Sequence, residues 1–178
     1  MRSYASAVTA ELGDLPGAAV GIGLCDAMLG TTELIRARRP TSLVFVGTAG
    51  ALPGSGVRIG DVVCTREVRL GDAALALGLG YSPRHPGALA GRAWGGVTQV
   101  VVITNLAITT DPALAARYAE AAQVEHMEAY GFALACERAG VPWSCLLGIT
   151  NEVGPHAHAQ WLENRARCEA AARAAARE

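Results

Sequence analysis

A set of short, almost uninterrupted apolar runs, separated by helical and alanine-rich stretches, constrains the fold more than any other feature of this sequence. TQVVVIT at 98–104 is the most strand-like of them, and SLVFVG at 42–47 and WSCLLGIT at 143–150 have the same character. Runs this short and this apolar are typical of strands that are covered by helices on both faces of a parallel sheet. The alternation therefore predicts an α/β domain, a three-layer αβα sandwich around a mixed, mostly parallel sheet.

Capping and turn residues place the boundaries of the expected elements. Asp111–Pro112 supplies an N-cap with proline at the first position of one expected helix. Gly140 ends a second expected helix shortly before Pro142. The glycine- and proline-rich stretch 71–96 predicts a long loop with at most a short helix. We expect strands near 2–7, 18–22, 42–47, 62–70 (bent or at an exposed edge), 98–104 and 143–149. We expect helices over 26–38, 111–121, 127–139 and 157–178, the last with Trp161 and Leu162 on its buried side.

Size and composition exclude several classes of protein. The 178 residues suffice for a single domain, 1–178, and a hydrophobic fraction of 51% with 17% charged residues argues against disorder. A net charge of −1 without a dense basic block argues against a nucleic-acid partner. The apolar stretches are too short for a membrane span, and the N-terminal residues do not resemble a signal peptide. Five cysteines without a CxxC pair fit reduced thiols of a cytoplasmic protein, and we expect neither a metal nor a cofactor.

Polar and glycine-rich residues follow several of the expected strands, at the edge where α/β sheets bind ligands. They are Ala10–Glu11, Gly21–Gly23, Gly47–Gly50, Thr104–Asn105 and Thr150–Asn151, together with Glu125–Glu128 at the expected start of a helix. Each of these groups by itself has an ordinary explanation as a tight turn, a packing loop or an acid beside a helix dipole. The order of these groups along the chain is more specific than any one of them.

The ordered set resembles the nucleoside phosphorylase/nucleosidase superfamily, which contains 5′-methylthioadenosine/S-adenosylhomocysteine nucleosidases, futalosine hydrolases and purine nucleoside phosphorylases. The resemblance rests on GIG followed by an alanine-containing helix, and on VFVGTAGAL with IGDVV shortly after it. It rests most specifically on VEHMEAYGFALACERAGVP followed by GITNEVG and a tryptophan. This resemblance implies cleavage of the bond between a ribose and a purine-like base.

The same resemblance implies roles for single residues. Glu11 is expected to hold and activate the attacking water, Glu128 to accept hydrogen bonds from the ribose hydroxyls, and Asn151 to contact the purine at N7. The other expected contacts are Thr48 near the water or phosphate, Ala49 and Gly50 along the sugar, Ile108 against the purine face and Met127 against the ribose. Cleavage through an oxocarbenium-like sugar requires these groups: a positioned nucleophile, a carboxylate near the ribose and hydrogen bonding to the leaving base.

Three departures from the pattern of the superfamily refine this expectation. Only nine residues separate Glu11 from Gly21, where relatives usually insert a β-hairpin. Leu147 stands where many relatives carry an arginine, and no Arg or Lys closely flanks the GTAG turn, which favours water over phosphate as the acceptor. Asn151 stands where adenine-specific nucleosidases carry Asp. The two N–H donors of an amide suit N7 and O6 of a 6-oxopurine.

The sequence thus predicts a nucleosidase that acts on a 6-oxopurine, futalosine-like ribonucleoside. Two alternatives within the superfamily are a purine nucleoside phosphorylase and a 5′-methylthioadenosine/S-adenosylhomocysteine nucleosidase. A third is a non-catalytic nucleoside-binding protein with the same fold. Relatives form dimers in which the loop matching Tyr81–Pro86 reaches over the neighbouring pocket, so we expect a homodimer or a larger homo-oligomer.

Overall fold

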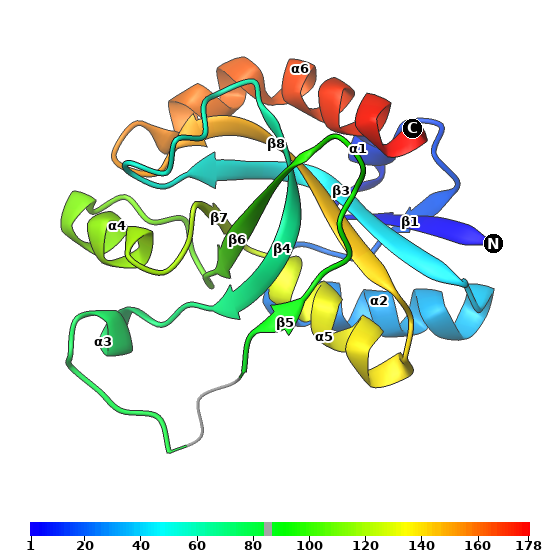
Figure 1. The fold of residues 1–178 in the computed structure, drawn as a ribbon, viewed down its shortest axis with the longest axis horizontal. Coiled ribbons are helices and arrows are strands. Elements are labelled where there is room, and N and C mark those ends of the chain that lie inside the picture. Colours follow the sequence, from blue (N-terminus) through cyan, green and yellow to red (C-terminus); the bar gives the residue numbers. More distant parts are fainter. Residues whose placement is uncertain (84–86) are drawn as a thin grey trace.

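The computed structural model describes residues 1–83 and 87–178 as one layer of strands wrapped by helices (Figure 1). In chain order the elements are β1 (Arg2–Ser6), α1 (Thr9–Leu12), β2 (Gly17–Ala19), α2 (Leu24–Arg38), β3 (Ser42–Ala51), β4 (Val62–Leu70), α3 (Ala73–Ala76), β5 (Leu89–Ala90), β6 (Thr98–Thr104), α4 (Pro112–Ala119), β7 (Val124–His126), α5 (Ala129–Ala139), β8 (Trp143–Glu152) and α6 (Ala157–Arg177). Part of the loop expected to reach over a neighbouring pocket, residues 84–86, lies outside the described residues.

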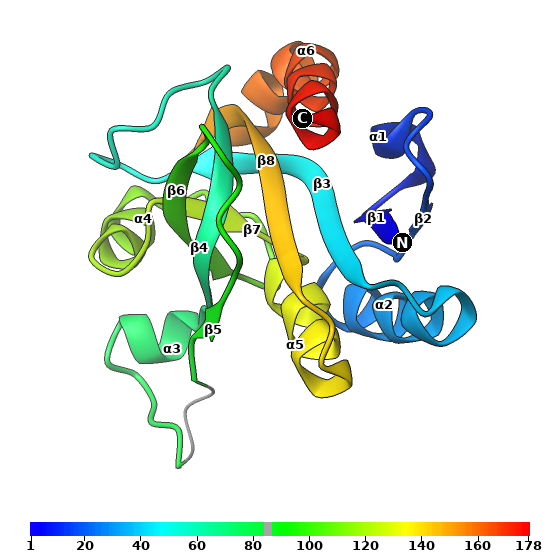
Figure 2. The same cartoon turned by 45° about the vertical axis from the view of Figure 1, so that its right-hand side comes forward.

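The sheet closes on itself into a barrel. Strand β8 pairs in parallel with β3 and antiparallel with β4, so that β3, β7, β6, β4 and β8 form a closed ring of five strands (Figure 2). Strands β1 and β2 extend from β3, and β5 extends from β4. The expected α/β class and mixed sheet are confirmed, but the plain αβα sandwich is wrong. Apolar strands predict burial on both faces, and they do not specify which edges meet.

Two irregularities mark places where the barrel strands change register. The pairing of β3 with β8 shifts between Ala49 and Gly50, and the pairing of β4 with β6 shifts between Thr65 and Glu67. Such bulges bend a strand and increase its local twist, which a closed barrel requires. The expectation of a bent strand over 62–70 is therefore confirmed, whereas the alternative of an exposed edge is wrong because β4 has neighbours on both sides.

Helices cover the barrel from two sides. Helices α2 and α5 pack against each other below it, with their first turns side by side, while α6 crosses the opposite side next to α1 (Figures 1 and 2). The approach of α5 to α2 requires Gly131, since a Cβ atom there would stand 2.1 Å from the carbonyl oxygen of Leu24. Leu162 on α6 is 54% exposed, contrary to expectation, and Trp161 is half-buried.

Several element boundaries differ from the expected ones in ways that affect the site. Strands β3 and β8 run on through Ala51 and Glu152, so residues expected in turns after these strands are part of them. Helix α5 begins at Ala129, and Glu125 and His126 belong to the short strand β7. A short helix, α1, carries Glu11 and was not expected. In β3, β7 and β8, cross-strand pairing outweighs local turn and helix propensity.

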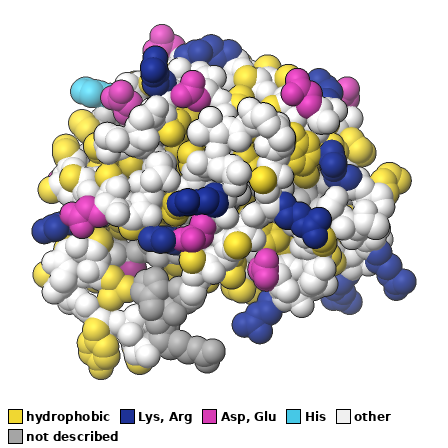
Figure 3. Space-filling view, in the orientation of Figure 1, with side chains coloured by type: hydrophobic (Ala, Val, Ile, Leu, Met, Phe, Trp, Pro, Cys, Tyr) yellow, Lys and Arg dark blue, Asp and Glu magenta, His cyan; other side chains and the backbone are white. Residues whose placement is uncertain are grey.

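The described residues contain no membrane-spanning helix, no metal-binding group of three or more side chains and no disulfide. No helix of the described chain is long and apolar enough to cross a membrane. No group of three or more His, Cys, Asp or Glu side chains within residues 1–83 and 87–178 is arranged to hold a metal ion. All five cysteines are free thiols, and only Cys25 is exposed. On the face shown in Figure 3, hydrophobic side chains reach the surface between acidic and basic ones.

Candidate active site

One cavity of about 590 Å³ lies at the ends of β1, β3, β7 and β8 and is covered by α6. All eight residues that the sequence singled out line it: Glu11, Thr48, Ala49, Gly50, Ile108, Met127, Glu128 and Asn151. The chain brings them together because β3 pairs directly with β8, with Gly50 opposite Asn151. Strand β7 pairs with the same end of β3, which places the residues that follow His126 at the cavity.

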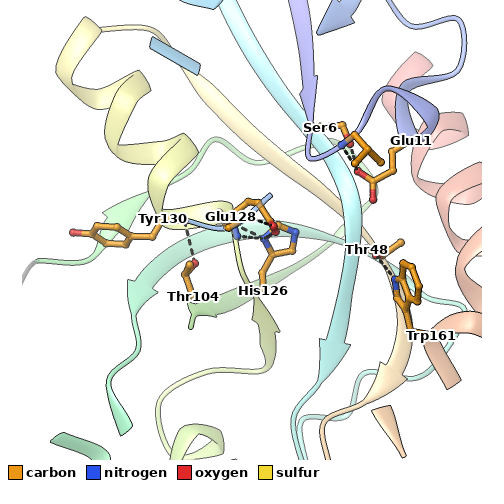
Figure 4. Close-up of polar contacts among 11 residues, drawn as sticks. Ser6, Glu11, Thr48, Thr104, His126, Glu128, Tyr130 and Trp161 are labelled. Atoms are coloured by element: carbon orange, nitrogen blue, oxygen red, sulfur yellow. Dashed lines mark hydrogen bonds and ion pairs between the residues drawn. The ribbon is translucent and has the colours of Figure 1, made fainter. Parts of the chain in front are cut away.

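Glu11 is a buried acid at the end of helix α1, and only 8% of its surface is exposed. Its carboxylate accepts hydrogen bonds from the Ser6 hydroxyl and from the backbone N–H of Val8, at 3.5 Å (Figure 4). Burial raises the pKa of Glu11, the two hydrogen bonds lower it, and the negative charges of Glu169 and Glu128 raise it further. The net direction is upward, which is the direction that makes a carboxylate a stronger base.

Glu128 connects two helices. It is the residue before α5, but its side chain does not cap that helix. Instead Oε1 accepts a hydrogen bond of 2.7 Å from the backbone N–H of Gly23, the residue before α2. This N–H lies at the start of α2, where the helix dipole places partial positive charge. Figure 4 shows the carboxylate next to the ring of His126.

The contact between His126 and Glu128 is not an ion pair. His126 Nδ1 lies 3.3 Å from Glu128 Oε2, but the same nitrogen accepts hydrogen bonds of 3.0 Å from the backbone N–H groups of Glu128 and Ala129. A nitrogen that accepts two hydrogen bonds carries a lone pair and not a proton. Burial also lowers the pKa of His126, more than the Glu128 charge raises it, so the neutral ring is favoured.

Both polar atoms of the Asn151 side-chain amide have hydrogen-bond partners within the protein. The hydroxyl of Thr150 lies 2.8 Å from Asn151 Oδ1, and Asn151 Nδ2 donates to the carbonyl of Glu152 at 3.2 Å. The opposite amide orientation would place two oxygen atoms against each other at Glu152 and is disfavoured. One of the two N–H donors expected for a purine is thus already used within the protein.

Helix α6 adds an aromatic wall to the cavity. Trp161 Nε1 donates to the Thr48 hydroxyl at 3.3 Å (Figure 4). The ring of His158 stacks on Trp161 with centroids 5.8 Å apart, and the guanidinium of Arg165 lies 5.0 Å from the Trp161 ring centroid. Arg165 is the only Arg or Lys among the described residues that line the cavity. It lies far from the GTAG segment in the sequence, so no local motif reveals it.

Glu125 fixes the loop that carries Ile108. Its carboxylate is buried and accepts from Asn105 Nδ2 at 2.7 Å and from the backbone N–H of Thr109 at 2.9 Å. Ile108 stays 51% exposed at the rim of the cavity. With Glu11, Glu125, Glu128 and Glu169 in its wall, the cavity carries four acids and a single arginine, and it favours neutral or cationic groups near the acids.

Comparisons with known proteins identify the family and the fold. The sequence profile described as the phosphorylase superfamily matches residues 8–178. The 5′-methylthioadenosine/S-adenosylhomocysteine nucleosidase of Halalkalibacterium halodurans is 27% identical over 162 residues, which are 80% of this chain and 70% of that protein. For two other curated nucleosidases of the same name, the alignment spans less than a third of their length, 30% and 31%.

Solved structures show the same fold. A crystal structure of 5′-methylthioadenosine/S-adenosylhomocysteine nucleosidase from Helicobacter pylori with butyl-thio-DADMe-Immucillin-A matches with a TM-score of 0.86 at 16% identity, covering 99% of this chain and 95% of that one. The native structure of futalosine hydrolase from Helicobacter pylori matches with a TM-score of 0.82 at 17% identity, covering 99% of this chain and 94% of that one. At these identities the likeness concerns the fold alone.

Proposed function

The chain belongs to the phosphorylase superfamily, and we propose that it is a nucleosidase that hydrolyses the N-glycosidic bond of a 6-oxopurine ribonucleoside. The observation that carries this proposal is the convergence of Glu11, Glu128 and Asn151, from three separate parts of the chain, on one cavity. Relatives and fold neighbours named as nucleosidases and as a futalosine hydrolase support the reaction class.

The proposed reaction begins with Glu11. Its ionised carboxylate accepts a proton from a water molecule while the water oxygen forms a bond to C1′ of the ribose. The bond between C1′ and N9 breaks, and its electron pair leaves with the purine, which takes up a proton from solvent. Glu128 lies where its negative charge and its hydrogen bonds to the ribose hydroxyls stabilise the positive charge that develops on the sugar.

The acidic lining of the cavity supports water over phosphate as the acceptor. A phosphate dianion would face four carboxylates, with Arg165 as the one cation among the described lining residues. That guanidinium is exposed and lies against Trp161, on the helix that covers the cavity. Leu147, at the position where many relatives carry an arginine, is fully buried in the hydrophobic core. The phosphorylase alternative therefore has less support than hydrolysis.

The amide of Asn151 supports a 6-oxopurine. With Oδ1 next to the Thr150 hydroxyl, the free end of the amide is a donor, and it suits N7 or O6 of a hypoxanthine- or guanine-type base. An amide cannot deliver a proton to the leaving base, so it helps through hydrogen bonding alone. A 6-aminopurine, in contrast, would place a second donor, its amino group, near this N–H.

A nucleoside panel tests the proposal. The protein is incubated with inosine, guanosine, adenosine and 5′-methylthioadenosine, with and without inorganic phosphate, and the free base and the sugar product are quantified. We expect base release from the 6-oxopurine nucleosides with free ribose as the second product, independent of phosphate. Release only with phosphate, and as ribose 1-phosphate, indicates the phosphorylase. Faster release from the adenine nucleosides contradicts the proposed base, and binding without release indicates the non-catalytic alternative.

We also propose that the protein acts as a cytoplasmic homodimer or larger homo-oligomer. Three aliphatic side chains on the cavity wall stay exposed: Val8 (38%), Ile22 (62%) and Ile108 (51%). Leu106, beside Ile108 on the same loop, is 75% exposed. Exposed apolar groups gathered around a ligand cavity are typical of a surface that a second protomer covers.

A further inference from the structure

His126 lines the cavity and is not explained by the proposed reaction. It ends strand β7, and its side chain is 4% exposed. Its Nδ1 accepts hydrogen bonds of 3.0 Å from the backbone N–H groups of Glu128 and Ala129, which begin helix α5. This ring nitrogen therefore caps the start of α5, a role in which an Asn or Asp side-chain oxygen is common.

These two hydrogen bonds fix the tautomer of the imidazole. Because Nδ1 accepts twice, the single proton of the neutral ring must reside on Nε2. The edge-to-face contact with Phe45, with ring centroids 5.3 Å apart and planes at 90°, fixes the orientation of the ring. His126 thus holds one N–H donor in a defined direction.

That N–H points away from α5 and toward strand β3. Nε2 lies 3.7 Å from the position that a Cβ atom would take on Gly47, and Figure 4 shows the ring between the carboxylate of Glu128 and β3. None of the hydrogen bonds of the described residues uses Nε2. The buried side-chain nitrogen and oxygen atoms without a partner in residues 1–83 and 87–178 are those of Thr31 and Asn105, so Nε2 is not sealed in the core. The free N–H therefore opens onto the cavity.

We propose that His126 binds the substrate directly, by donating its Nε2–H to a ribose hydroxyl that in turn donates to Glu128. The inference rests on the proposed function, because it requires a ribonucleoside in the cavity. A carboxylate can only accept, so a hydroxyl that donates to Glu128 still needs a donor for its own oxygen. Glu128 and His126 lie side by side and together provide one acceptor and one donor, which is the complement of a sugar hydroxyl and makes His126 a determinant of ribose recognition.

Two substitutions separate the capping role from the binding role. In His126→Asn, the amide oxygen occupies the region of Nδ1 and still accepts from the start of α5, while the cavity donor is lost. In His126→Gln, the longer amide reaches toward the Nε2 position and supplies an N–H, while the acceptor for α5 is lost. Helix capping therefore predicts a larger drop in melting temperature for Gln, and ribose binding predicts a larger loss of affinity for Asn.

Calorimetric titration with inosine, 2′-deoxyinosine, 3′-deoxyinosine and 2′,3′-dideoxyinosine tests the proposal, alongside the melting temperature of each variant. We expect His126→Asn to weaken inosine binding roughly 10-fold, as for the loss of one hydrogen bond. We expect no weakening for the dideoxy analogue, and the monodeoxy analogue that is unaffected identifies the hydroxyl concerned.

An equal loss for all four ligands, or no loss for inosine, overturns the binding role of His126 while leaving the proposed function intact. If the wild-type protein binds none of the four nucleosides, the proposed function itself is overturned, and the role of His126 in ribose recognition with it. If the wild type binds inosine without releasing hypoxanthine, hydrolysis is refuted, and the comparison of the variants still decides the role of His126.

Discussion

The Glu128 carboxylate accepts a 2.7 Å hydrogen bond from the backbone N–H of Gly23, a residue 105 positions away in the sequence. This contact joins the start of α5 to the start of α2 and turns the carboxylate toward the cavity. The side chain that is expected to bind the ribose is therefore held by the same packing that brings α2 and α5 together. Glu128 therefore has both a structural contact and an expected role in binding the substrate.

Glu128→Gln is expected to reduce cleavage roughly 100-fold or more, since a charge-assisted contact that strengthens in the transition state is lost. The glutamine oxygen still accepts from Gly23, so the melting temperature should change little. Binding of inosine should weaken more than that of 2′-deoxyinosine. Steady-state kinetics and calorimetry measure these effects, and Glu152→Gln, an exposed acid on the end of β8, is the matched control. Equal affinities of wild type and variant for both ligands would mean that Glu128 has a structural role only.

Glu11→Gln is expected to abolish most of the activity and to stabilise the fold at neutral pH. Burial raises the pKa of Glu11 above 4.5, so the folded state holds the proton more tightly than the unfolded chain. Ionisation in the folded protein therefore costs stability as the pH rises through and above 4.5, and this cost is absent below it. We expect a higher melting temperature for the variant at pH 7, by about 2–4 °C for each kcal/mol gained.

The pH dependence provides the check on Glu11. The difference in melting temperature between variant and wild type should close as the pH falls below about 4.5, where Glu11 is protonated in both states. The wild-type kcat/KM should lose activity on the acid side with an apparent pKa above 4.5, because the base must be ionised. A variant that is less stable than wild type at pH 7 would refute the cost of burying this charge.

Asn151→Asp should shift the base preference toward 6-aminopurines. A protonated carboxyl donates to N7 while its second oxygen accepts from the adenine amino group, which the amide nitrogen of Asn151 cannot do. One exchanged hydrogen bond corresponds to roughly a 10-fold change in the ratio of kcat/KM for adenosine and inosine. Competition between the two nucleosides in one reaction measures this ratio directly. An unchanged ratio, with activity retained, would exclude Asn151 as the residue that reads the base.

Gly131→Ala tests the packing of α5 on α2. A Cβ atom would meet the Leu24 carbonyl oxygen at 2.1 Å, so the helices must move apart, at a cost of about 1–3 kcal/mol that exceeds the gain in helix propensity. Gly95→Ala is the control, since nothing lies within 4 Å of its Cβ position. Urea unfolding should show a lower midpoint for the first variant only. Equal midpoints would mean that this contact adjusts without cost.

The expected oligomer has a direct test in light scattering. At micromolar concentration the mass should be at least twice the 18.3 kDa of one chain. Ile22→Glu places a charge among the exposed aliphatic side chains at the cavity and should lower the mass to that of the monomer. A monomer mass for the wild type would refute the proposed assembly.

Local patterns in the sequence were sufficient for most of the elements. The apolar run at 98–104 is strand β6, and the Asp111 side chain caps α4 by accepting from the Leu114 N–H at 2.7 Å. Gly140 ends α5 with a φ of 65°, a conformation that glycine adopts without strain. In each case the signal and the structure lie within one turn or one strand, so neighbouring residues contain all the necessary information.

The residues of the candidate site were also found from sequence, through a motif resemblance and not through geometry. The eight chosen residues line one cavity, while their chemical roles stay predictions. Arg165 and Trp161 were missed as site residues because nothing in α6 itself shows which of its faces meets β3. His126 was expected at the start of a helix, and its bonds to the start of α5 were not foreseen because β7 was not recognised as a strand.

The sequence by itself determined the long buried strands and the long helices, but not the short elements α1 and β7. The tertiary structure alone decided that β8 joins β3 to β4 and closes a barrel. It also decided that Glu128 binds Gly23 and that His126 keeps a free N–H for the cavity. The reason is physical: burial and capping are read over a few neighbouring residues, whereas edge pairing and hydrogen-bond partners depend on groups far apart in the chain that only folding brings together.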